Sequence, residues 1–130
     1  MTRIFDETVT ADASRDINSV HYDIVSSQAP GVFVYTEIQT SVPFDKSPWQ
    51  DRNTKLKTAP GLIGKTRLTG HNTHTLGGFD AFDSVENAQK FALHSFPKVA
   101  ASLNLAFITR VFDASITAEM SRDMRSPFYI

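Results

Sequence analysis

The pattern of apolar and polar positions predicts strands that alternate with helices from residue 32 onward. Residues 32–40 (VFVYTEIQT) alternate between two faces and are rich in β-branched and aromatic side chains, which is typical of a strand. Residues 62–68 and 75–82 are two further β-prone runs, and the polar turn 69–73 between them predicts a β-hairpin. Residues 105–112 (LAFITRVF) predict the last strand.

A helix is predicted over residues 47–58, between the first strand and the hairpin. Ser47 is a good N-cap, Pro48 suits the first helical position, and Gln50 completes an S-x-x-Q capping box. Pro60 stops the helix.

A second helical segment follows the hairpin. Asp83 is the predicted cap and Glu86 lies three positions on, which again forms a capping box. Apolar residues recur at helical spacing up to Leu103, and Asn104 can end the segment. Pro97 predicts a kink or two short helices near residues 95–96.

The two ends of the chain lie outside this regular pattern. Residues 1–18 are polar and are predicted to form an extension or arm, and the alternation in residues 19–25 allows an extra strand. Residues 114–123 are compatible with a short helix, and the chain ends in an apolar tip, residues 127–130. We therefore predict three parts: an N-terminal arm (1–31), a core domain (32–113) and a C-terminal tail (114–130).

The order strand, helix, strand, strand, helix, strand predicts an α+β protein with a ferredoxin-like βαββαβ core. In this pattern two helices cover one face of an antiparallel sheet. The alternating strands place apolar side chains on both faces, so the second face also needs cover. We expect a second copy to supply it, which gives a homodimer with twofold symmetry.

Composition narrows the classes of function. The 130 residues suit one domain with 41% hydrophobic and 21% charged residues, and the net charge of −1 comes without a basic cluster, so no nucleic-acid partner is expected. The chain has no Cys, which excludes disulfides, thiolate metal sites and a Cys nucleophile. The N-terminus lacks the apolar segment of a signal peptide, and no run is long enough to span a membrane, so we expect a cytoplasmic protein. The ten Phe residues indicate an aromatic core, cavity or interface.

Three residues of the predicted helix 47–58 are candidates for a small-molecule site. The spacing of Trp49 and Leu56 turns Arg52 or Asn53 toward the sheet. A buried Arg or Asn needs partners, and a few polar groups in an apolar lining are typical of ligand pockets. The alternatives are that Arg52 extends to the edge, that Asn53 satisfies a backbone group and that Trp49 is a core anchor.

The strands contribute further candidates. Tyr35 lies on the first strand, Arg67 and Asp80 lie on the hairpin, and all three either form cross-strand pairs or line a pocket. Gly78, beside Gly77 within a strand, marks a close approach by a neighbouring side chain or by a ligand. His74 is either an exposed turn residue or a proton acceptor, and with His71 it forms an H-x-x-H pair that is weak evidence for a metal site.

Several of these segments resemble a known family. PGLIGKTRL, HTLGGFDAFDS and RVFDA are similar to the YdhR-like mono-oxygenase family of the dimeric α+β barrel superfamily. The resemblance covers residues 32–114. The matching positions are Pro60, Gly61, Lys65, His74, Gly77, Gly78, Phe82 and Val111-Phe112-Asp113.

The resemblance implies a homodimer with a small apolar pocket between the sheet and the helices of each subunit. It implies a cofactor-independent mono-oxygenase that acts on a small aromatic or phenolic molecule, with His74 as base and Asn53, Arg52 or Tyr35 as orienting groups. Trp49, Arg67, Gly78 and Asp80 would contact the substrate. The alternative is a non-catalytic ligand-binding or interaction module of the same fold. A haem-binding relative would need an axial ligand, for which His94 is the candidate.

Overall fold

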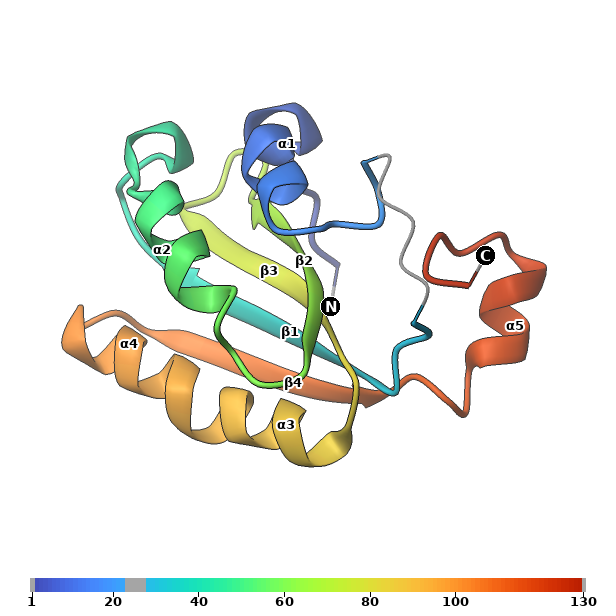
Figure 1. The fold of residues 1–130 in the computed structure, drawn as a ribbon. Coiled ribbons are helices and arrows are strands. Elements are labelled where there is room, and N and C mark those ends of the chain that lie inside the picture. The colour runs from blue at the N-terminus through green and yellow to red at the C-terminus, as the bar shows by residue number, and fades with distance from the viewer. Residues whose placement is uncertain (1, 23–27, 130) are drawn as a thin grey trace.

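A four-stranded antiparallel sheet forms the centre of the protein, as the computed structural model of residues 2–22 and 28–129 shows (Figure 1). The strands lie in the order β2-β3-β1-β4. Their bounds are β1 (Val32–Gln39), β2 (Leu62–Thr69), β3 (Thr75–Phe82) and β4 (Phe107–Asp113). The protein is therefore α+β, as the sequence predicted, and the architecture is compatible with a ferredoxin-like fold.

Strand pairing places two rows of paired residues across the sheet, and each row contains charged or polar side chains. Lys65 pairs with Asp80, which pairs with Val34 on the far side. Two residues further along β2, Arg67 pairs with Gly78, which pairs with Thr36. Because alternate residues of a strand share a face, both rows lie on the same side of the sheet. That side is the one that the helices cover.

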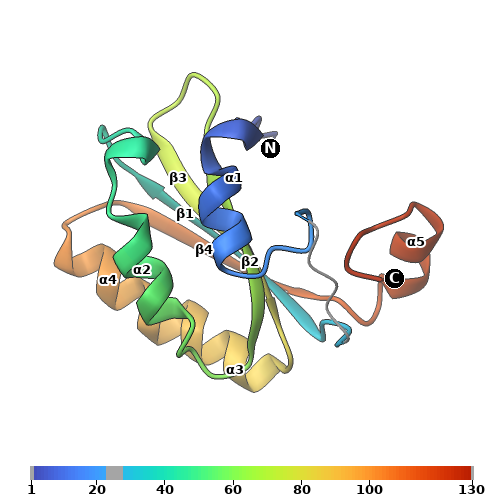
Figure 2. The same cartoon turned by 45° about the horizontal axis from the view of Figure 1, so that its top comes forward.

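The helices that pack on this face come from three segments of the chain (Figures 1 and 2). They are α1 (Glu7–Asp16), α2 (Trp49–Leu56) and the pair α3 (Val85–Lys90) and α4 (Phe96–Ser102). Two apolar clusters hold them to the sheet, one around Phe82 and Phe91 and the other around Ile38 and Phe44. None of the helices in the described part of the chain is long and apolar enough to cross a membrane.

Both predicted capping boxes are wrong in detail. The hydroxyl of Ser47 donates to the carbonyl of Phe44 at 2.8 Å, because residues Phe44–Lys46 form a 3-10 turn, and α2 begins after Pro48 with no side-chain cap. The cap of α3 is Ser84 rather than Asp83, and its hydroxyl accepts from the Asn87 N–H at 3.2 Å.

The break near Pro97 takes the form of a π-helical turn. Residues Phe91–Ser95 form this turn between α3 and α4, immediately before the position where Pro97 has no N–H to donate. Phe91 and Ala92 are buried in the turn. The predicted interruption is thus confirmed, and the turn leaves the Phe91 side chain packed between the sheet and the helices.

The N-terminal segment contains a helix that the sequence did not predict. The buried side chains of α1 are Thr10, Ala13 and Ser14, so its inward face is small and partly polar and carries no apolar stripe. These small residues let α1 approach edge strand β2, where the Ser14 hydroxyl accepts from the Arg67 N–H at 2.8 Å and the Ile17 carbonyl accepts from the Lys65 N–H at 3.1 Å. The helix thereby satisfies an otherwise open sheet edge.

The predicted extra strand at residues 19–25 is not formed in its described part. Residues 19–22 lie in turn and irregular backbone, and residues 23–27 lie outside the described residues. The alternation therefore does not produce a strand in residues 19–22.

The second sheet face is covered in part by the protein's own ends. Phe128 of the tail packs on Phe33 and Phe79, with ring centroids 4.8 and 5.8 Å away. Near the other end of the face, Arg3 donates to Glu37 at 2.9 Å. The last helix, α5 (Ala118–Asp123), buries none of its residues and lies apart from the sheet (Figures 1 and 2).

Candidate functional site

A cavity of about 670 Å³ lies on the helix-covered face of the sheet. Its walls come from the segment that contains α2, from the π-helical turn and α4, and from strands β1, β2 and β3. The aromatic side chains of Phe44, Trp49, Phe91 and Phe96 line it. Its volume is within the range of small-molecule sites, which are mostly apolar with a few polar groups.

The charged residues that line this cavity are mainly basic. Five of them are basic and one, Asp51, is acidic, although the whole chain has a net charge of −1. The basic residues are Arg52, Lys55, Lys65, Arg67 and Lys90. The cavity therefore favours an anionic group on its ligand.

Lys65 and Asp80 form a buried ion pair beside the cavity. The Lys65 ammonium lies 3.3 Å from Asp80 Oδ1, and the two side chains are 3% and 0% exposed. Gly78 provides the space for it, because a Cβ at this position would lie 2.9 Å from Lys65 Nζ and 3.0 Å from Asp80 Oδ1. The ammonium also lies 5.6 Å from the centre of the Phe91 ring. Of the two predicted reasons for Gly78, close approach by a neighbouring side chain is the one the structure shows.

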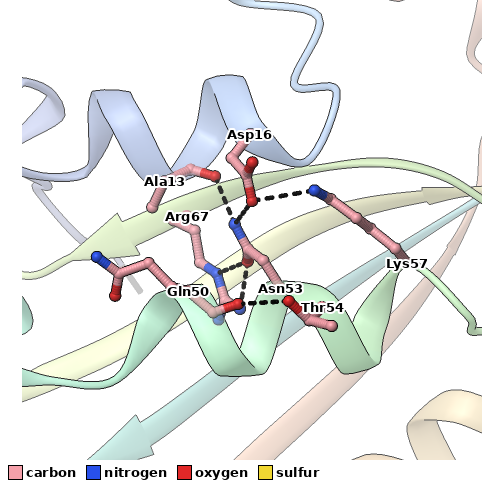
Figure 3. A network of polar contacts seen from close by, with 7 residues as sticks. All are labelled: Ala13, Asp16, Gln50, Asn53, Thr54, Lys57 and Arg67. Atoms are coloured by element: carbon pink, nitrogen blue, oxygen red, sulfur yellow. Dashed lines mark hydrogen bonds and ion pairs between the residues drawn. The ribbon is translucent and has the colours of Figure 1, made fainter.

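Arg67 is held by Asn53, which connects it to α1 (Figure 3). The amide oxygen of Asn53 accepts from Arg67 Nε at 3.1 Å and from Nη2 at 2.7 Å. The amide nitrogen donates to the Ala13 carbonyl at 2.9 Å and to Asp16 Oδ2 at 3.1 Å, and Lys57 lies 3.2 Å from the same Asp16 oxygen. Asn53 is fully buried, so its four contacts fix the orientation of the Arg67 guanidinium.

Two buried oxygen atoms near the cavity lack hydrogen bonds within the described residues. They are Thr36 Oγ1 and Asp80 Oδ1. Asp80 Oδ1 is within ion-pair distance of the Lys65 ammonium, which donates its hydrogen bond to the other carboxylate oxygen, Oδ2, at 3.4 Å. Thr36 is among the residues around the cavity, and its side chain is fully buried.

Burial changes the acid–base properties of this cluster. It lowers the pKa of Lys65 to about 8, against the opposing effect of Asp80. It also lowers the pKa of Arg67 to about 10, which leaves the guanidinium protonated at neutral pH. It raises the pKa of Asp80, and the charges of Lys65 and Arg67 oppose that rise. Lys65 is thus the group in the cavity whose proton is exchangeable near neutrality.

The structure brings together most of the residues that the sequence nominated. Trp49, Arg52 and Arg67 line the cavity. Asn53 lies directly behind Arg67, and Asp80 and Gly78 lie at the Lys65 amine. The expectation that α2 turns Asn53 toward the sheet is confirmed by its complete burial.

Tyr35 and His74 lie elsewhere. Tyr35 is on the opposite face of the sheet, where its hydroxyl donates to Glu37 at 2.9 Å, and burial raises its pKa to about 12. It is therefore separated from Arg67 by the sheet. His74 is exposed at the hairpin turn and borders a separate depression with Asp6 and Thr40. His94 is exposed on the π-helical turn and is not among the lining residues.

Sequence reasoning did not nominate Lys65, Thr36 or Phe91 for the site. Lys65 and Arg67 lie two residues apart in a predicted strand and therefore share a face, but the sequence does not show that this is the covered face. Their spacing of two residues within a β-prone run was the available signal. Phe91 enters the cavity through the π-helical turn, which has no clear sequence pattern.

Comparisons with known proteins do not assign the chain to a family. No protein-family model matches it, and no curated protein is significantly similar to it.

Proposed function

We propose that this protein is a cofactor-independent mono-oxygenase-like enzyme of the YdhR-like kind, which takes a small phenolic molecule into the cavity on the helix-covered face. The observation that supports this most strongly is the buried Lys65 amine, which lines the same cavity as the aromatic side chains and lies 5.6 Å from the centre of the Phe91 ring. A phenol has an ordinary pKa near that of tyrosine, about 10, so it needs a nearby cation or base to ionise at neutral pH.

Lys65 supplies a cation when its amine is protonated and a base when its amine is neutral. In its neutral form the amine accepts the proton as the phenol O–H bond breaks, which leaves an ammonium beside a phenolate. For an anthrone-type substrate, the resulting anion gives one electron to dioxygen and the two radicals combine to form a carbon–oxygen bond. Loss of water from the peroxide then gives the quinone, so one oxygen atom enters the product and the other leaves as water. The aromatic walls exclude solvent from the reacting anion.

A non-catalytic ligand-binding role is the second candidate. The ion pair between Lys65 and Asp80 favours it, because the carboxylate stabilises the ammonium form, and a protonated lysine cannot accept a proton from the ligand. In this role the basic cavity holds an aromatic anion without oxidising it.

Oxygen uptake and quinone formation separate the two roles. The purified protein is incubated with an anthrone and a hydroquinone under air, beside the Lys65→Met variant and an exposed control, Lys98→Met. The enzyme hypothesis expects turnover that Lys65→Met reduces by at least about 100-fold, the usual contribution of a general base, while Lys98→Met retains it. Binding without oxygen uptake supports the second role. Loss of turnover in His74→Ala, with full activity in Lys65→Met, would instead identify His74, at the hairpin turn, as the base.

We also propose that the protein is a homodimer that pairs through the second sheet face. Phe112 on β4 is 47% exposed and lies opposite Phe33, at the side of this face. Sedimentation velocity measures the assembly. We expect Phe112→Glu to convert a dimer to a monomer and Val85→Glu, on the exposed side of α3, to leave it a dimer. A monomeric wild type contradicts the proposal.

A further inference from the structure

The positive charge beside the cavity is not fully neutralised by the described residues. Lys65 and Arg67 are two buried cations, and Asp80 is the one buried carboxylate next to them. Arg52 adds to the positive potential, because its charge lowers the pKa of both cations. Since an unpaired charge in a poorly hydrated site is costly, an anion in the cavity would be strongly stabilised there.

Among the described residues, Lys65 is paired with the Asp80 carboxylate, whereas Arg67 has no carboxylate partner. Its guanidinium has five N–H donors. The N–H groups at Nε and Nη2 donate to the side-chain amide oxygen of Asn53, which carries no charge. Within residues 2–22 and 28–129, Nη1 has no hydrogen-bond acceptor, and no carboxylate lies within ion-pair distance of Arg67. The Arg67 residue as a whole is 9% exposed, and it lines the cavity. Asn53 holds it in place from behind, so it is ordered before any ligand binds.

We propose that the cavity ligand carries one carboxylate, which pairs with the Arg67 guanidinium while its aromatic ring lies against Trp49 and Phe96. This deepens the proposed function, on which it rests, by making the substrate a hydroxylated aromatic acid. The planar guanidinium matches the planar carboxylate in shape and charge. A singly charged carboxylate also costs less to desolvate between the aromatic side chains of the cavity than a phosphate dianion does.

Three matched small molecules test this with the wild-type protein alone. They are 4-hydroxybenzoate, its neutral amide 4-hydroxybenzamide, and the dianionic 4-hydroxyphenyl phosphate. Calorimetry at pH 7 gives the affinities, and quenching of Trp49, the single Trp of the chain, reports that the ligand is in the cavity. We expect the acid to bind at least about tenfold more tightly than the amide, as hydrogen bonds to a charged group allow.

Two variants locate the charge that is responsible. Arg67→Gln should abolish the preference for the acid, and Arg122→Gln, exposed on α5, should retain it. An amide that binds as tightly as the acid overturns the proposal, as does tighter binding of the phosphate or the absence of binding by all three at millimolar concentration. Failure of the proposed enzyme activity is seen separately, as a retained preference for the acid without oxygen uptake.

Discussion

The charge on Lys65 should make the stability of the protein depend on pH, which the charge of an exposed lysine with an unshifted pKa does not do. The ordinary pKa of 10.5 holds in the unfolded chain, whereas the folded protein has a value of about 8. The unfolded chain therefore binds the proton more tightly, and the charged ammonium destabilises the fold below pH 8. This destabilisation disappears as the pH rises from 8 toward 10.5, so the free energy of unfolding should increase over that window.

The size of the effect follows from the two pKa values. Each pKa unit corresponds to about 1.4 kcal/mol, so the charged form costs about 3 kcal/mol in total. Most of this, about 2–3 kcal/mol, is recovered between pH 7 and pH 10. Solvent screens this charge little, because the Lys65 side chain is only 3% exposed.

Urea unfolding of the wild type and of Lys65→Met, at several values from pH 7 to pH 10, measures this contribution. The wild type should gain about 2–3 kcal/mol relative to the variant over that range, while tyrosine ionisation affects both proteins and cancels in the difference. Lys98→Met, which removes an exposed ammonium, should follow the wild type. If the curves for wild type and Lys65→Met stay parallel, Lys65 has an ordinary pKa and the assignment of the exchangeable proton in the cavity is wrong.

Three further substitutions test the packing of the site and of the sheet. Asn53→Ala should lower the free energy of unfolding by about 2–3 kcal/mol in urea, because buried N–H groups of Arg67 lose their acceptor. Gly78→Ala should displace the Lys65 amine. The free energy of unfolding of this variant should then rise less between pH 7 and pH 10 than that of the wild type, as the same titration measures. Phe128→Ala should cost about 2 kcal/mol, less than a fully buried Phe, and thermal unfolding that is unchanged would show that the tail does not hold the second sheet face.

The strands and the hairpin were predictable because their information is local. Alternation in residues 32–40 and the polar turn after residue 68 determine β1 and the β2–β3 pair, and the observed bounds differ by a residue at most. The break in the last long helix was also predictable, because Pro97 removes a backbone donor whatever surrounds it. By contrast, α1 was missed because its buried face is made of small residues, which a pattern of large apolar side chains cannot reveal.

The candidate site was likewise predictable only in part. Periodicity places Lys65 and Arg67 on one face of a strand and turns Asn53 inward, and these relations follow from the geometry of strands and helices alone. The sequence does not say which face the helices cover, so Tyr35 and Arg67 were equally acceptable as partners. The tertiary structure separates them to opposite sides of the sheet and leaves His74 at an exposed turn.

What the sequence by itself determined is therefore the set of elements and the residues that share a face within each. The cavity, its excess of basic side chains and the connection from Arg67 through Asn53 to α1 exist only after those elements have packed. The physical reason is that a burial-dependent property, such as the lowered pKa of Lys65, depends on neighbours that are distant in the chain. Asp80, Gly78 and Phe91 come together around that amine through strand pairing and helix docking, which no local pattern encodes.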